Sequence, residues 1–180
     1  MSCYKAPAMS RKFIQEYVRK IKRMVGMEYK LRFTVVDFLE KTIPMCFPDF
    51  QLEIVPDKEM ENKHGETYPS KKLIRIKEKV YLDAIKGKGR DRFTIAHEIG
   101  HLLMHDEHSI VLCELAPNEK LRTFENPEWQ ANAFAGELLA STYLIQGMSI
   151  ADISKKCGVS KKAAEIQLNA ALKLTSDEIK

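Results

Sequence analysis

The segment that most constrains this chain is a five-residue motif with two histidines, His97-Glu98-Ile99-Gly100-His101. The flanking residues are apolar on one side with helical spacing, so the two imidazoles lie about one turn apart on the same helix face. Both rings can therefore reach a single metal ion, and two imidazoles suit zinc. Glu98 directly follows the first histidine, where a carboxylate can accept a proton from water activated by the metal. The motif predicts a zinc site on a packed helix.

A catalytic zinc site needs a third protein ligand, and four of the five histidines fall between His97 and His108. His105 continues the helical series, but a straight helix places it roughly 12 Å along the axis from His97. No residue between them favours a break in the helix. We therefore expect His105 to support a ligand or to lie on the helix face, and His108 to lie at the surface.

A carboxylate on the next predicted helix is the better third ligand. Glu128 lies near the start of that helix, and Asn132 shares its face one turn later, where it could orient an imidazole through the free ring nitrogen. Glu125 and Glu137 compete with Glu128 on chemistry alone. We expect zinc to be held by His97, His101 and Glu128.

Two segments resemble the signatures of the ImmA/IrrE family of metallo-endopeptidases. Residues 92–105 resemble the active-site helix of that family, and residues 128–139 are similar to its second signature. A weaker likeness extends over residues 65–172. The chain departs from the family in reading Ala140-Ser141 where a proline usually follows the Leu-Leu pair, which affects the end of the helix rather than the ligands.

The resemblance implies a cytoplasmic, zinc-dependent endopeptidase. In that family the leading glutamate of the second signature is the third zinc ligand, and this role falls on Glu128. The implied partner is a protein substrate, a helix-turn-helix repressor of the Xre type, whose cleavage relieves repression of a mobile element or a stress regulon. A donor to the oxyanion is also expected. Tyr143, His105 and Arg122 remain open candidates for it.

The pattern of apolar residues and helix breakers predicts an α+β fold, with a mostly helical zinc-peptidase core, a small antiparallel sheet and a short helical C-terminal appendage. We expect the peptidase domain to span residues 1–147 and the helix-turn-helix-like appendage to span residues 148–180. The predicted helices cover about residues 11–25 after a Ser10 cap, 35–41 ending before Pro44, 80–85, 91–106 with Asp91 as cap, 127–144, and two short helices within 149–174. The predicted strands are residues 49–55 and 71–78, with a loop at 57–70 and irregular chain at 115–127. The lysines of 71–78 are typical of a sheet edge, to which an extended substrate could add as a further strand.

Two other functions are compatible with parts of the sequence. Residues 150–168 have the look of a helix-turn-helix with nearby lysines, but residues 161–172 lack an obvious set of base-reading side chains, so direct DNA binding is not expected. A non-catalytic protein could instead bind the repressor around a structural metal. The glutamate beside His97 and the lack of a fourth ligand argue against that alternative.

Composition narrows the remaining possibilities. The net charge of +4 is too small to indicate nucleic-acid binding by itself. No apolar run approaches the roughly 20 residues of a membrane span, and no signal-peptide pattern opens the chain, so we expect a cytoplasmic protein. The four cysteines are widely scattered and form no paired motif, which favours reduced thiols.

Overall fold

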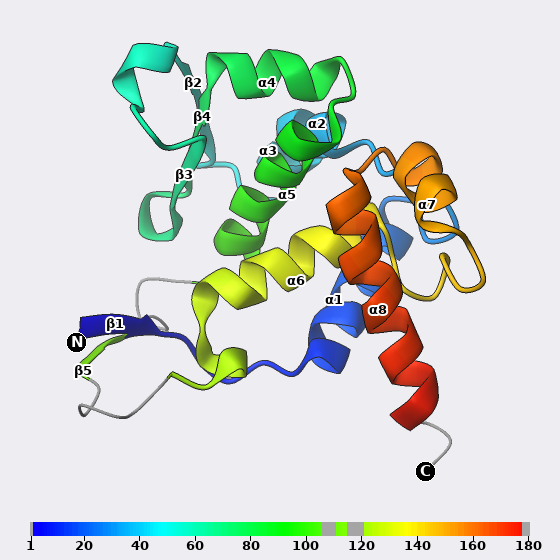
Figure 1. Ribbon diagram of the computed structural model, residues 1–180. Coiled ribbons are helices and arrows are strands. Elements are labelled where there is room, and N and C mark those ends of the chain that lie inside the picture. The colour runs from blue at the N-terminus through cyan, green and yellow to red at the C-terminus, as the bar shows by residue number, and fades with distance from the viewer. Residues whose placement is uncertain (1, 106–110, 115–120, 178–180) are drawn as a thin grey trace.

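The computed structural model describes residues 2–105, 111–114 and 121–177 (Figure 1). Its strands are β1 (Ser2–Lys5), β2 (Gln51–Val55), β3 (Gly65–Tyr68), β4 (Leu73–Lys77) and β5 (Val111–Glu114). Its helices are α1 (Arg11–Met24), α2 (Val35–Asp37), α3 (Ile43–Cys46), α4 (Glu78–Ile85), α5 (Gly89–Met104), α6 (Pro127–Leu139), α7 (Ile150–Cys157) and α8 (Lys161–Asp177). A π-helical turn, Phe38–Thr42, joins α2 to α3. The α+β class is confirmed.

Helices α5 and α6 pack against each other at the centre of the fold, with α1 and α8 against α6 (Figure 1). A Cβ atom at Gly100 of α5 would lie 3.0 Å from Cδ1 of Phe134 and 3.3 Å from Cα of Ala131 on α6, so a side chain there would require these neighbours to shift by a few tenths of an ångström. The glycine thus permits close approach of the two helices. Asn126 caps α6 by accepting hydrogen bonds from the backbone amides of Glu128 and Trp129, which fixes the first turn of that helix.

The three-stranded sheet is mixed, which corrects the prediction of a wholly antiparallel one. Its order is β2-β4-β3, with β2 parallel and β3 antiparallel to β4. The second predicted strand, β4, is therefore central, and the prediction of an edge there was wrong. Arg75 explains the error: its guanidinium bonds to Glu53 on β2 and to Glu66 on β3, so the charges of β4 lie on one face of the sheet. Its other face carries Ile74 and Ile76, both fully buried.

Three strands, β1, β3 and β5, were not predicted. β3 lies within residues 57–70, which the sequence indicated as a loop, because its four residues are mostly polar and show no alternation of apolar side chains. β1 pairs with β5 in a separate antiparallel ribbon. That pairing joins segments more than one hundred residues apart, and no local pattern marks it.

Several predicted helix ends were also wrong. The helix expected to stop before Pro44 continues to Cys46, because the π-helical turn before it lets the chain accommodate the proline. α5 begins at Gly89 rather than at an Asp91 cap, and a Cβ atom at Gly89 would lie 2.5 Å from the carbonyl carbon of Val159. It ends at Met104, and residue 106 lies outside the described residues. α6 ends at Leu139, where the amide of Thr142 bonds to the Glu137 carboxylate.

The first and the last helices match their predictions more closely. The hydroxyl of Ser10 caps α1 by accepting a hydrogen bond from the Phe13 amide. α7 and α8 are separated at Gly158, whose positive φ of 67° ends α7. Ile153, Cys157 and Ala164 from these helices join the same buried cluster as α1, α5 and α6. The division between residues 147 and 148 stays a prediction. No helix in the described part of the chain is both long and apolar enough to span a bilayer.

One lysine is wholly buried between α1 and the end of α6. Lys22 is 0% exposed, and its Nζ donates to Oγ of Ser141 at 2.8 Å and to the Lys30 carbonyl at 3.2 Å. Removal from water disfavours the charged amine, and this burial lowers the pKa of Lys22 to about 8 from 10.5.

The buried amine predicts a specific pH dependence of stability. Between about pH 8 and pH 10.5 the unfolded chain binds a proton at Lys22 that the folded chain does not, so the free energy of unfolding rises with pH in that window. The rise is about 3 kcal/mol at most. Urea unfolding measures the free energy of unfolding of wild type and of Lys22→Met across this range. The wild-type value minus the variant value should increase with pH. Lys20→Met, an exposed neighbour, should track wild type, and a constant Lys22→Met difference would contradict the assignment.

Candidate metal centre

Three side chains from α5 and α6 converge on one point. Nε2 of His97 and Nε2 of His101 lie 3.0 Å apart, and they lie 3.3 and 3.2 Å from the two carboxylate oxygens of Glu128. In a tetrahedral zinc site with bonds of about 2.0–2.1 Å, neighbouring ligand atoms are about 3.3 Å apart. The donor set and its spacing therefore fit zinc. In the described part of the chain this is the group of three side chains that could hold a metal.

The outer nitrogens of both histidines have partners, and these partners determine which nitrogen carries the proton. Oδ1 of Asn132 lies 3.1 Å from Nδ1 of His97. Because a carbonyl oxygen only accepts, that Nδ1 carries the hydrogen and Nε2 keeps its lone pair. The geometry agrees with the orienting contact expected for Asn132.

A longer chain of hydrogen bonds orients His101. Nε2 of Gln130 donates to the carbonyls of Pro7 and Phe124, at 2.7 and 2.8 Å, so its oxygen must face Nε2 of His105, at 2.8 Å. His105 Nε2 therefore donates, and its Nδ1 accepts from Nδ1 of His101 at 3.0 Å. This leaves the lone pair of His101 Nε2 directed at the centre. His105 thus supports a candidate ligand, one of the two positions expected for it. Gln130 was missed, because a glutamine on an apolar helix gives no signal.

Glu98 lies on the side of α5 that faces β3. Its side chain is 7% exposed, and the hydroxyl of Thr67 donates to its Oε2 at 2.6 Å. A Cβ atom at Gly65 would lie 2.7 Å from Cγ of Glu98, so only glycine lets β3 come this close. Burial raises the pKa of Glu98, against the opposing effect of the Thr67 hydrogen bond and the nearby imidazoles. Thr67 was missed together with its strand.

The charges at the centre are strongly coupled. When both imidazoles are protonated, Nε2 of His101 and of His97 donates to Glu128, and these hydrogen bonds hold the pKa of Glu128 well below its usual range, although its side chain is 66% exposed. The neutral tautomers described above are the forms that would bind a metal. Burial disfavours the charged form of His97, but the contact with Glu128 and the charge of Glu98 outweigh it and raise the pKa of this imidazole. Negative charge thus gathers around two imidazoles, an arrangement that favours a bound cation.

The other two carboxylates considered as the third metal ligand have partners away from the centre. Glu125 pairs with Lys5 at 2.9 Å, and the buried Glu137 accepts from the Thr142 amide at 2.9 Å. Two of the candidates for a donor to the oxyanion already have hydrogen-bond partners. The Tyr143 hydroxyl donates to the Glu28 carbonyl, and both ring nitrogens of His105 are in contact with neighbours. Arg122 is exposed, and His108 lies outside the described residues.

Loss of the Gln130 side chain should destabilise the whole fold. Gln130→Leu leaves the buried His105 N–H without its partner and removes a hydrogen bond from each of the part-buried Pro7 and Phe124 carbonyls, of which the second still accepts from the Met9 amide, so we expect a loss of about 2 kcal/mol. Urea unfolding measures this loss directly. Gln146→Leu, the same change at an exposed position, should alter the free energy of unfolding by less than about 0.5 kcal/mol. Equal effects of the two substitutions would show that the chain of hydrogen bonds adds nothing to stability.

Comparison with known proteins gives one match. Residues 51–169 match the family model of Peptidase_M78, described as the IrrE N-terminal-like domain. Comparison with the curated proteins found no match, and neither did comparison with the solved structures. The matched segment includes β3, the central helices α5 and α6, the three candidate ligands His97, His101 and Glu128, and the adjacent Glu98. Because it covers well over half of the 180 residues, the chain belongs to the Peptidase_M78 family of metallopeptidases, as its two sequence signatures indicated.

Proposed function

We propose that this protein is a zinc-dependent endopeptidase with a narrow choice of substrate. The observation that supports it most directly is the convergence of two imidazole nitrogens and one carboxylate at tetrahedral spacing, beside a buried glutamate. His97, His101 and Glu128 hold the metal in this proposal. Bound zinc supplies Lewis-acid chemistry, since it lowers the pKa of water and polarises a carbonyl oxygen.

Glu98 is the proposed general base and general acid. Its raised pKa suits a carboxylate that must accept a proton and release it again. Glu98 takes one proton from water as the water oxygen bonds to the peptide carbonyl carbon. It then passes that proton to the amide nitrogen as the C–N bond breaks. The Thr67 hydroxyl holds Oε2 of Glu98 in place during both transfers.

β3 offers the edge along which an extended substrate could bind. It is one of the two outer strands of the three-stranded sheet in the described residues, and unlike β2 it has a residue, Thr67, that contacts Glu98 on α5. A peptide added to that edge would form main-chain hydrogen bonds with little demand on sequence. β3 therefore takes the role first expected of residues 71–78.

The proposed substrate is an Xre-type helix-turn-helix repressor, cleaved in the cytoplasm to relieve repression of a mobile element or a stress regulon. Family resemblance supports this substrate. The competing proposal is a protein that binds the repressor without cleaving it and whose metal is structural. A structural zinc site usually closes with four protein ligands, whereas the described residues bring three together here.

Metal content tests the ligand set. Wild type loaded with zinc and freed of excess should retain about one zinc per chain, and Glu128→Ala should lose most of it, because two imidazoles alone bind weakly. Glu125→Ala removes a nearby carboxylate that pairs with Lys5 and should retain zinc. Metal analysis by mass spectrometry measures all three. Equal zinc in both variants would exclude Glu128 as a ligand.

Removing the proposed acid–base should separate metal binding from catalysis. Glu98→Gln should keep zinc but cleave the Xre-type repressor encoded nearest to the gene at least about 100-fold more slowly, because the amide cannot carry the proton. Gel analysis of purified protein and repressor gives the rate. Glu53→Gln, which alters an exposed carboxylate on β2, serves as the matched control. Cleavage at the wild-type rate by Glu98→Gln would contradict the mechanism.

A further inference from the structure

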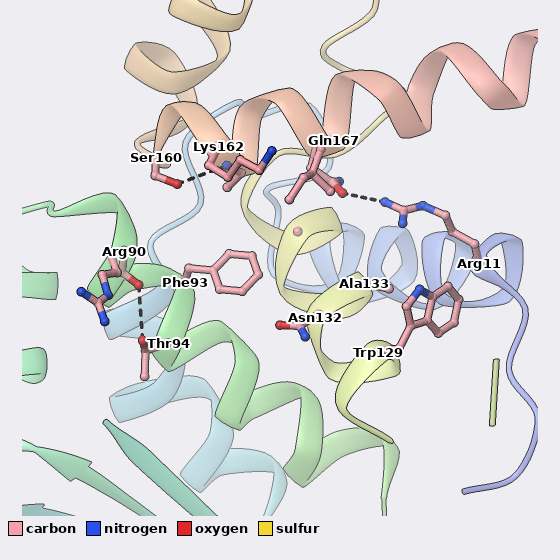
Figure 2. A pocket seen from close by; sticks show the side chains of 13 residues that line it. Arg11, Arg90, Phe93, Thr94, Trp129, Asn132, Ala133, Ser160, Lys162 and Gln167 are labelled. Carbon is pink, nitrogen blue, oxygen red and sulfur yellow. Dashed lines mark hydrogen bonds between the residues drawn. The ribbon is translucent and has the colours of Figure 1, made fainter. Parts of the chain in front are cut away.

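A cavity of about 520 Å³ lies beside the candidate metal centre, between α5, α6 and α8. Figure 2 shows Phe93 on α5, Asn132 and Trp129 on α6, and Gln167 on α8 around it. Asn132 lies between the cavity and the metal centre: its side chain lines the cavity, and its Oδ1 contacts Nδ1 of His97. The cavity therefore adjoins the metal centre. Its volume is sufficient for more than one side chain of a bound molecule.

The cavity continues the helix face that carries the metal-binding histidines. Arg90, Thr94 and His97 follow at helical spacing on α5, and the first two line the cavity. A molecule bound at the metal can thus extend along α5 into the cavity within about one turn, roughly 5 Å.

The charged residues that line the cavity are all cationic: Arg11, Arg90 and Lys162. Lys162 is paired with Glu165 at 3.1 Å, but neither arginine has a carboxylate within 4.0 Å among the described residues. Nη2 of Arg90 contacts Nε2 of His64 at 3.0 Å, and Nη2 of Arg11 donates to Gln167 at 2.6 Å. Nε of Arg11 is buried and has no hydrogen-bond partner in the part of the chain that the structure describes. The charge of the buried Glu137 already acts on Arg11, so Arg90 is the guanidinium better placed to accept an anionic partner.

Between these cations most of the exposed lining is apolar, with Thr94, Asn132, Ser160 and Gln167 as the uncharged polar residues. Phe93, Trp129 and Ile166 supply most of the large apolar side chains, and Ile166 is 51% exposed although it lies against the cavity. In Figure 2 Arg90 and Arg11 stand at opposite ends, with Phe93 and Trp129 between them. The lining therefore matches a large apolar group that is joined to a carboxylate.

We propose that this cavity binds the segment of the protein substrate next to the cleaved bond, and that it selects a large apolar side chain adjacent to an acidic residue. A peptide is favoured over a free small molecule by continuity with β3. His64, the residue before β3, contacts Arg90, so the open edge of that strand leads to the Arg90 end of the cavity. The inference rests on the proposed function, and Arg90 is its specificity-determining residue.

Trp129 provides a direct readout, because it lines the cavity and is the one tryptophan of the chain. The full chain with Glu98→Gln, loaded with zinc, is titrated with N-acetyl-Leu-Asp-amide, with its neutral partner N-acetyl-Leu-Asn-amide, and with 4-methylvalerate. We expect a saturable change in tryptophan emission, with the Asp peptide binding at least about five-fold more tightly than the Asn peptide. Equal binding of the two peptides, or tighter binding of 4-methylvalerate, would overturn the proposal.

Two variants in the same background test the location. Arg90→Gln should reduce the preference for the Asp peptide to less than about two-fold, because the charge that distinguishes the two peptides is gone. Ala163→Phe should abolish the response to both by filling the cavity from α8. Lys156→Gln, an exposed charge change on α7, should behave like the parent. If Arg90→Gln does not fold, Ala163→Phe decides, and an unchanged response in it would overturn the inference.

Cleavage of the repressor separates this inference from the proposed function. Selective binding of the Asp peptide by a protein whose wild-type form cuts no repressor would refute the enzyme and leave a peptide-binding cavity. Cleavage at equal rates by wild type, Arg90→Gln and Ala163→Phe would support the enzyme and refute the role of the cavity.

Discussion

Close packing of α5 on α6 is the constraint on which the candidate centre depends. The two helices belong to separate parts of the chain, and the absence of a side chain at Gly100 lets them approach until Phe134 lies against the α5 backbone. At that separation Glu128 reaches the nitrogens of His97 and His101. A Cβ atom at Gly100 would require Phe134 or the α6 backbone to shift by a few tenths of an ångström, so glycine is the residue that fits this packing without adjustment. The glycine inside the motif thus acts on packing, while its neighbours supply the chemistry.

The surroundings of the centre connect it to distant parts of the fold. Gln130 joins His105 to the carbonyls of Pro7 and Phe124, so the segment before α1 helps to set the tautomer of His101. On the opposite side, β3 holds Glu98 through Thr67. Because the imidazoles and the glutamate are positioned by different elements, a disturbance in either element should reach only part of the proposed mechanism.

Much of the candidate centre could be predicted because its residues lie close together in the sequence, on two helices. His97, Glu98 and His101 lie within one and a half turns of a helix, and Glu128 and Asn132 share a face of the next. Gln130 and Thr67 could not be predicted, because their roles depend on distant partners: His105 and Pro7 lie 25 and 123 residues from Gln130, and Glu98 lies 31 residues from Thr67. The same limit applies to the sheet. The apolar residues among the basic ones in residues 71–78 predicted a strand, but its central position depends on pairing with β2 and β3, where Arg75 meets carboxylates on both neighbours.

The sequence by itself determined the family, the α+β class and the helix that carries the two histidines, because each follows from residue type and local periodicity. Only the tertiary structure decided which carboxylate meets those histidines, which strand lies beside Glu98, and where the cationic cavity opens. The physical reason is that a periodic pattern specifies one face of one element. Which faces meet is decided by packing between elements, through contacts such as those of Gly100 and Gly65 that local periodicity does not encode.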